Sequence, residues 1–208
     1  MANCRPYRLT PFSVGEELDE NMAIRLKSWL SQFCTWHEQF KKGALGAELM
    51  AAYTEARADL SATLVLAQRL EIRDAGARQA LRVARAIPVE FDLRSGKASA
   101  LTQDISISGL SALVGDAPVV GSQLSFRLKL GRDVEAITGR CRVVAAIPVQ
   151  GSVRMAVSFE EITNEAGQRI ENLVFDAICA EIRTVLLRNG HGATIRMDVK
   201  DLPIAGKG

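Results

Sequence analysis

The spacing of apolar residues changes near Gly76, and this change divides the 208-residue chain into two kinds of structure. Before it, apolar residues recur every three or four positions, which is the period of a helix with one buried face. After it, from Ile87 to Phe159, short runs rich in Val, Ile and Leu alternate with polar residues, as half-buried strands do. The pattern predicts a fold of the α+β class, with helices first and strands afterwards.

Two helices are predicted before the change of period. The first covers residues 16–40 and carries Trp29 and Trp36 on its apolar stripe, and the second covers residues 45–72. A basic last turn and Gly43 are typical of a helix C-terminus, so the two helices should form an antiparallel hairpin. We interpret the aromatic stripe as a packing surface, against the second helix or against another subunit, rather than as a ligand slot.

Six strands are expected after the change of period, with Gly or Pro in the connections between them. Antiparallel strands of this number leave no exposed edge when they close into a barrel. A helix should follow, with capping residues at 163–165 and a stop at Asn189-Gly190. The expected strands are 87–93, 100–107, 110–114, 123–130, 135–147 and 152–159.

These elements define three predicted parts of the chain. They are a helical hairpin or interaction domain over 1–75, a barrel with its C-terminal helix over 76–190, and a tail over 191–208. The first residues lack the apolar run of a secretory signal, and no segment is long and apolar enough to span a membrane. We therefore expect a cytoplasmic protein without membrane insertion.

The sequence offers little for catalysis or for metal binding. Nucleophile-elbow, phosphate-loop, dinucleotide-binding and zinc-protease motifs do not occur, and the chain has two histidines, His37 and His191. The four cysteines are far apart, so we interpret them as small buried apolar residues that stay reduced. We predict a protein that is not an enzyme and uses no metal and no cofactor.

Positive charge is concentrated in the middle of the chain. Residues 76–155 carry eleven basic and six acidic residues, whereas the net charge of the whole chain is +2. Arginine outnumbers lysine nineteen to seven, and its guanidinium group can bind phosphates and stack on flat rings. Because the strands contain few aromatic residues for base stacking and the charge is modest, we predict that the barrel does not bind nucleic acid.

Two motifs lie around the first two predicted strands. Arg78 and Arg82 form an R-x-x-x-R pair before the barrel, and residues 104–109 read D-x-S-x-x-G after the second strand. This combination resembles the PilZ domain, the bacterial receptor module for cyclic di-GMP. The order and separation of the motifs, the six strands and the helix after them agree with the resemblance, which covers residues 78 to about 188 and not the helical hairpin.

The residue types suit the polar groups of cyclic di-GMP. Guanidinium groups can bind its phosphates or the O6/N7 edge of guanine, whereas a carboxylate accepts hydrogen bonds from guanine N1–H and N2–H. On one strand, Asp104 and Ser106 should point to the ligand, and Ile105 and Ile107 to the core. Gly109 permits a tight turn and a close approach of backbone to ring.

The resemblance implies a receptor for cyclic di-GMP with an output in motility or biofilm regulation. We expect this receptor to relay the level of the nucleotide to a protein partner through a hinge between helical domain and barrel. The alternative is a PilZ-like scaffold or adaptor that binds a protein partner, or forms a homo-oligomer through its helices, without obligatory nucleotide. The implied nucleotide-binding residues are Arg78, Arg82, Asp104, Ser106 and Gly109, with Arg85 as a further candidate.

The conformation of the arginine segment has two possible forms at this point. The second helix could continue from Leu70 through Arg82, which would place Arg78 and Arg82 on one helix face. An extended and flexible segment would instead let both arginines close over the ligand.

Overall fold

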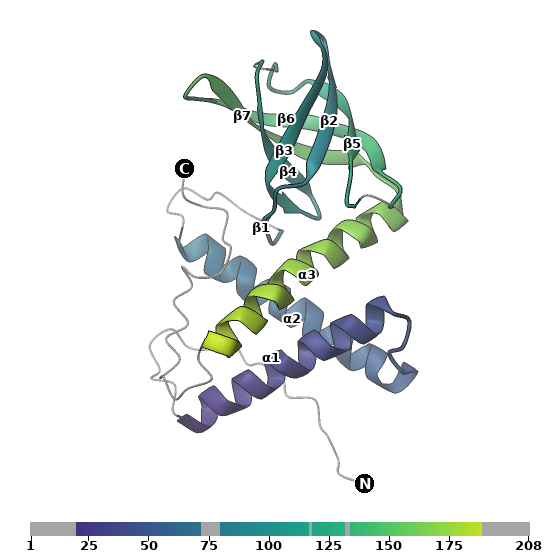
Figure 1. Ribbon diagram of the computed structural model, residues 1–208, viewed down its shortest axis with the longest axis vertical. Helices are drawn as coiled ribbons and strands as arrows, with labels where there is room; N and C mark the ends of the chain where they lie inside the picture. Colours follow the sequence, from purple (N-terminus) through teal and green to yellow (C-terminus); the bar gives the residue numbers. More distant parts are fainter. Residues whose placement is uncertain (1–19, 72–79, 117, 132–133, 189–208) are drawn as a thin grey trace. The chain divides into compact units, whose positions relative to one another are not determined.

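The computed structural model describes residues 20–71, 80–116, 118–131 and 134–188. Along the chain they form two helices, seven strands and a third helix (Figure 1). These residues divide into two compact units, one of which contains Ala80–Ala177, while the other contains the first two helices and residues 178–188. The predicted domain boundaries near residues 75 and 190, and the predicted tail over 191–208, lie outside the described residues.

Helices α1 (Glu20–Lys41) and α2 (Ala47–Glu71) form the predicted helical hairpin. The end of α1 is a Schellman motif, in which Gly43 has a φ of 66° and Ala44 N–H donates to the carbonyl oxygen of Gln39 over 2.8 Å. This C-terminal turn is the one that the basic residues and the glycine predict. None of the helices in the described part of the chain is long and apolar enough to cross a membrane.

Aromatic side chains pack the two helices together. Phe33 on α1 and Tyr53 on α2 are both buried, and their ring centroids are 5.8 Å apart. The Tyr53 hydroxyl lies 2.7 Å from Nδ1 of the buried His37, so this polar pair is hydrogen-bonded inside the unit. Trp29 stacks on Phe33 at a centroid distance of 5.9 Å, which extends the aromatic packing along α1.

The strands form one antiparallel sheet in the order β1-β3-β2-β5-β6-β7-β4, and an additional β3–β4 pairing closes strands β2 to β7 into the predicted six-stranded barrel (Figure 1). The short strand β1 was not predicted, because two residues carry no readable alternation of polarity. It pairs with the end of β3. The strands are β1 (Val83–Ala84), β2 (Pro88–Leu93), β3 (Gly96–Ser106), β4 (Gly109–Val114), β5 (Gln123–Leu128), β6 (Ile137–Val149) and β7 (Ser152–Glu161).

Alternating side chains fill the interior of the barrel. Ile105 on β3, Leu110 on β4 and Met155 on β7 are completely buried. The prediction that Ile107 also faces this core is wrong, because its side chain is 48% exposed. β3 ends at Ser106, so Ile107 lies in the turn to β4, where the alternation of a strand no longer applies.

Helix α3 (Asn164–Arg188) follows β7, as predicted. Thr163 caps it, because Thr163 Oγ1 accepts a hydrogen bond from Ala166 N–H over 3.1 Å. Its residues up to Ala177 belong to the same unit as the barrel, and those from Ile178 belong to the unit that contains α1 and α2.

The cysteines in the described part of the chain, Cys34, Cys141 and Cys179, are all buried, as their interpretation as small apolar residues requires. Burial raises the pKa of the Cys141 thiol to about 12, and the nearby Glu160 carboxylate adds to this effect. Cys141 therefore stays a neutral thiol at physiological pH. Cys4 lies outside the described residues.

The turn between β6 and β7 generates a stability prediction. Val149 pairs with Ser152, and the two residues between them, Gln150 and Gly151, have φ values of 34° and 81°. Two-residue hairpin loops with both φ values positive prefer Asn-Gly, because Asn tolerates the left-handed region better than most side chains. Gln150→Asn should therefore raise the free energy of unfolding by about 0.5–1 kcal/mol, measured by chemical denaturation.

Gln32→Asn on α1 is the matched control, since Gln32 is exposed, lies in a helix and has no positive φ. We expect it to lower stability slightly, because Asn has a lower helix propensity than Gln. A Gln150→Asn variant less stable than the wild type would contradict the turn assignment.

Candidate functional site

The polar residues of the second motif lie on the outer face of the barrel. Ile105 pairs with Leu110, and both side chains are in the core. Alternation then places Asp104 and Ser106 on the opposite, outer face, together with Ser111, which pairs with Asp104. All three outer-face residues are nevertheless buried.

A β-bulge determines the face to which Asp104 points. The pairing of β3 with β4 shifts between Thr102 and Asp104, so that β3 has one extra residue, Gln103, at this point. Thr102 shares a face with Ala112, whereas Asp104 shares a face with Ser111. Without the extra residue, Thr102 and Asp104 would lie on the same face of β3.

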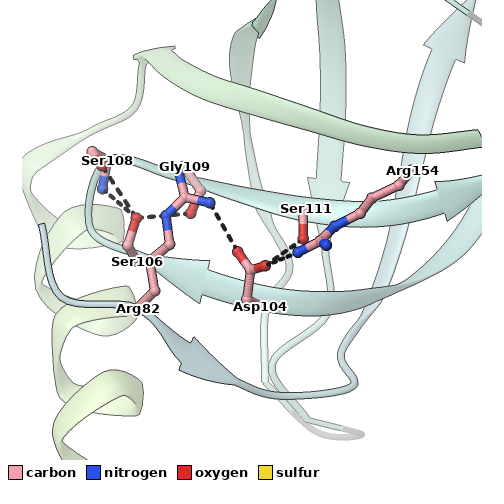
Figure 2. A network of polar contacts seen from close by, with 7 residues as sticks. All are labelled: Arg82, Asp104, Ser106, Ser108, Gly109, Ser111 and Arg154. Atoms are coloured by element: carbon pink, nitrogen blue, oxygen red, sulfur yellow. Dashed lines mark hydrogen bonds and ion pairs between the residues drawn. The ribbon is translucent and has the colours of Figure 1, made fainter. Parts of the chain in front are cut away.

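Asp104 is the centre of a network of charged and polar contacts (Figure 2). Its Oδ1 accepts from Arg82 Nη1 over 3.1 Å. Its Oδ2 accepts from Ser111 Oγ over 2.6 Å and from Arg154 Nη2 over 3.2 Å. The Asp104 side chain is 2% exposed, whereas the side chains of Arg82 and Arg154 are 25% and 29% exposed. An almost fully buried carboxylate therefore fixes two arginine side chains that are partly exposed to solvent.

Ser106 organises the turn between β3 and β4. Its Oγ donates to the Gly109 carbonyl oxygen over 3.1 Å, accepts from Ser108 N–H over 3.3 Å and lies 3.1 Å from Ser108 Oγ. These contacts, visible in Figure 2, are a local side-chain-to-backbone turn. In this arrangement Ser106 holds the turn beside Asp104.

Gly109 is needed for close packing between strands. A Cβ atom at this position would lie 2.1 Å from the Val157 carbonyl oxygen on β7. Gly109 has no positive φ, so the turn itself does not require glycine. The structure thus gives this motif residue a packing role between β4 and β7.

The other arginines predicted for the site have different positions. Arg78 lies outside the described residues. Residues 80–82 are not helical and Arg82 directly precedes β1, so the alternative in which the helix continues through Arg82 is wrong. Arg85 is exposed between β1 and β2 and does not join the Asp104 network that Figure 2 draws, although its backbone N–H donates to the Gln103 carbonyl oxygen over 3.3 Å.

Sequence reasoning missed two members of the network, Ser111 and Arg154. Ser111 lies in an apolar run, and Arg154 lies in the last strand of the barrel, fifty residues after Asp104. An arginine at an outward position of an alternating strand was the available signal for Arg154. The strand register that brings it to Asp104 is not readable from the sequence. In the described part of the chain no group of three or more His, Cys, Asp or Glu residues could hold a metal ion.

Comparison with known proteins assigns the barrel to a family. The family model of the PilZ domain matches residues 77–176, which include Arg82, Asp104, Ser111 and Arg154. Residues 77–176 of this chain therefore belong to the PilZ domain family, as the two motifs predicted. A search of curated proteins found no match.

Several solved structures are similar to this chain. The inhibitor of motility MotI/DgrA of Bacillus subtilis is 17% identical, with a TM-score of 0.45, and the match covers 50% of this chain and 52% of that one. The PilZ domain of YcgR from Escherichia coli, solved with c-di-GMP, is 12% identical, with a TM-score of 0.43, over 55% of this chain and 98% of that one. The MrkH–c-di-GMP complex of K. pneumonia is 17% identical, with a TM-score of 0.47, over 53% and 56%. This chain thus spans about half the length of MotI and of MrkH.

The close packing at Gly109 generates a prediction for the site. Gly109→Ala should lower the free energy of unfolding by about 1–3 kcal/mol, because the new methyl group has to displace the backbone of β7. Denaturant unfolding of the variant measures the loss.

Gly115→Ala is the control, because a Cβ at Gly115 meets nothing within 4 Å and Gly115 has no positive φ. We expect this variant to unfold within about 0.5 kcal/mol of the wild type. Equal stability of the two alanine variants would show that β4 and β7 are not as close as the structure places them.

Proposed function

We propose that this protein is a non-catalytic, cytoplasmic receptor for cyclic di-GMP, which it binds on the outer face of the barrel beside the turn between β3 and β4. The observation that carries the proposal is the ion pair between Arg82 and Asp104, which joins the two motifs across twenty-two residues of sequence. The family assignment of residues 77–176 supports it, because the PilZ domain is a receptor module for this nucleotide.

The charge of the cluster suits a ligand with two phosphates. Arg82, Arg154 and Asp104 together carry a net charge of about +1, and the positive groups are the exposed ones. A guanidinium can bind a phosphate or the O6/N7 edge of guanine with two parallel hydrogen bonds. In the proposed complex Arg82 binds the nucleotide together with Arg78, and Arg85 is a further contact.

The remaining predicted residues complete the proposed site. Asp104 accepts hydrogen bonds from guanine N–H donors. It does so at a carboxylate lone pair that its present partners do not use, or after one of these partners has been displaced. Ser106 and Gly109 keep the turn in the shape that exposes this edge of the barrel. Each of these roles is part of the proposal.

A relay to a protein partner is the second part of the proposal. Arg82 lies in the stretch that leads from the helical hairpin into β1. A ligand that replaces Asp104 as the partner of Arg82 changes the contacts of this stretch. It can shift the equilibrium between two arrangements of the stretch only by as much as its affinity differs between them. We place the hinge here, with an output in motility or biofilm regulation.

Calorimetric titration with cyclic di-GMP tests the receptor. We expect binding at micromolar concentration or tighter, and a loss of affinity of at least about tenfold in both Arg82→Ala and Asp104→Ala, since each removes a charge-assisted contact. Arg127→Ala is the control, because Arg127 is an exposed arginine on β5, which pairs with neither β3 nor β4. No heat with the folded wild-type protein would refute the receptor.

One observation favours the alternative of a scaffold that needs no nucleotide. Both oxygens of Asp104 are already bonded to the protein itself, so the network could serve only to tie the start of the barrel to β3, β4 and β7. In that case the wild type should not bind cyclic di-GMP, while Asp104→Ala should lower the unfolding temperature. Light scattering of the wild type would then test whether the chain forms the expected homo-oligomer.

A further inference from the structure

The arginine on β7 has no assigned role in the site, although it contacts the same carboxylate as Arg82. Arg154 pairs with Leu113 on β4, and two residues further along β7, Ala156 pairs with Ser111. The Arg154 side chain crosses β4 diagonally and reaches Oδ2 of Asp104 on β3 at 3.2 Å. Residues from three strands and from the stretch before β1 thus meet at one carboxylate (Figure 2).

The two arginines bond to different oxygen atoms of the Asp104 carboxylate, and this determines the geometry of the cluster. Arg82 bonds to Oδ1, and Arg154 bonds to Oδ2, where Ser111 adds a third hydrogen bond. Opposite oxygens of one planar group therefore hold the two guanidinium groups on either side of Asp104. The fixed spacing reduces the side-chain entropy that each arginine would lose on binding an anion.

The exposed fractions of Asp104, Arg82 and Arg154 determine which of these side chains a ligand contacts first. Asp104 is almost sealed at 2%, whereas the Arg154 side chain is 29% exposed. A guanidinium group has five N–H donors, and the bond to Asp104 uses one of those of Arg154. An incoming anion consequently meets guanidinium N–H groups from both sides before it can reach the carboxylate.

We propose that Arg154 is a further ligand-binding residue, which contacts a phosphate or the O6/N7 edge of guanine, and that Asp104 acts mainly as a positioning residue for Arg154 and Arg82. The proposal rests on the proposed function, because it concerns the same nucleotide. It changes the role of Asp104 from a direct reader of guanine donors to a counter-ion that fixes two arginines.

The experiment compares Arg154→Met with the wild type by calorimetric titration with cyclic di-GMP. Methionine keeps much of the apolar stem and removes the charge and all the donors. We expect a loss of affinity of at least about tenfold, the size expected for a charge-assisted hydrogen bond to the ligand. Arg140→Met is the matched control, because Arg140 is an exposed barrel arginine with its own ion pair, to Glu161 at 3.8 Å.

Arg154→Lys separates ligand binding from a purely structural ion pair. Lysine keeps the charge opposite Asp104 but lacks the planar fork. We expect it to unfold at the wild-type temperature and still to bind at least about threefold more weakly. Wild-type affinity in either Arg154→Met or Arg154→Lys would overturn the proposal, and Arg154→Lys alone decides if Arg154→Met fails to fold. A wild-type protein that does not bind at all would instead refute the receptor itself.

Discussion

A carboxylate that is removed from water needs compensation for its lost hydration, and in this barrel the compensation of Asp104 links four segments of the chain. Arg82 before β1, Ser111 on β4 and Arg154 on β7 all donate to it. Removing any one donor leaves a buried charge less well satisfied, which is more costly than the loss of an exposed ion pair. The position of β1 and the closure between β3 and β4 therefore depend on the same charged group that is proposed to organise the ligand site.

The β-bulge at Gln103 makes this arrangement possible. The core needs Ile105 inside, and the network needs Asp104 outside and buried under its partners. One extra residue lets Thr102 and Asp104 occupy different faces of the same strand. Three features thus follow one another along the β3–β4 hairpin and shape the site together. They are the bulge at Gln103, the hydrogen bonds of Ser106 and the close approach of β4 to β7 at Gly109.

The sequence predicted the helices and the six barrel strands, because local period carries that information. The resemblance to the PilZ domain implied that Arg82 and the D-x-S-x-x-G motif belong to one site, but not that Arg82 pairs with Asp104. The sequence did not predict that Arg154 belongs to the same cluster, since a contact between β7 and β3 depends on strand order and register. Ile107 was placed in the core because the extrapolated alternation ran one residue past the end of β3. β1 escaped detection because its two residues are held by pairing with β3 and not by a pattern of their own.

The close packing at Gly109 has a consequence for relatives that have lost the nucleotide during evolution. A relative with this backbone still has to accommodate the Val157 carbonyl oxygen, so selection for folding alone would keep the glycine. Ser106 would also persist, because its hydrogen bonds shape the turn. The two arginines could be lost only together with Asp104, because either one lost alone would leave that buried carboxylate less well satisfied. Gly109 and Ser106 therefore report on folding, whereas Asp104 with both its arginines is the better indicator of ligand binding.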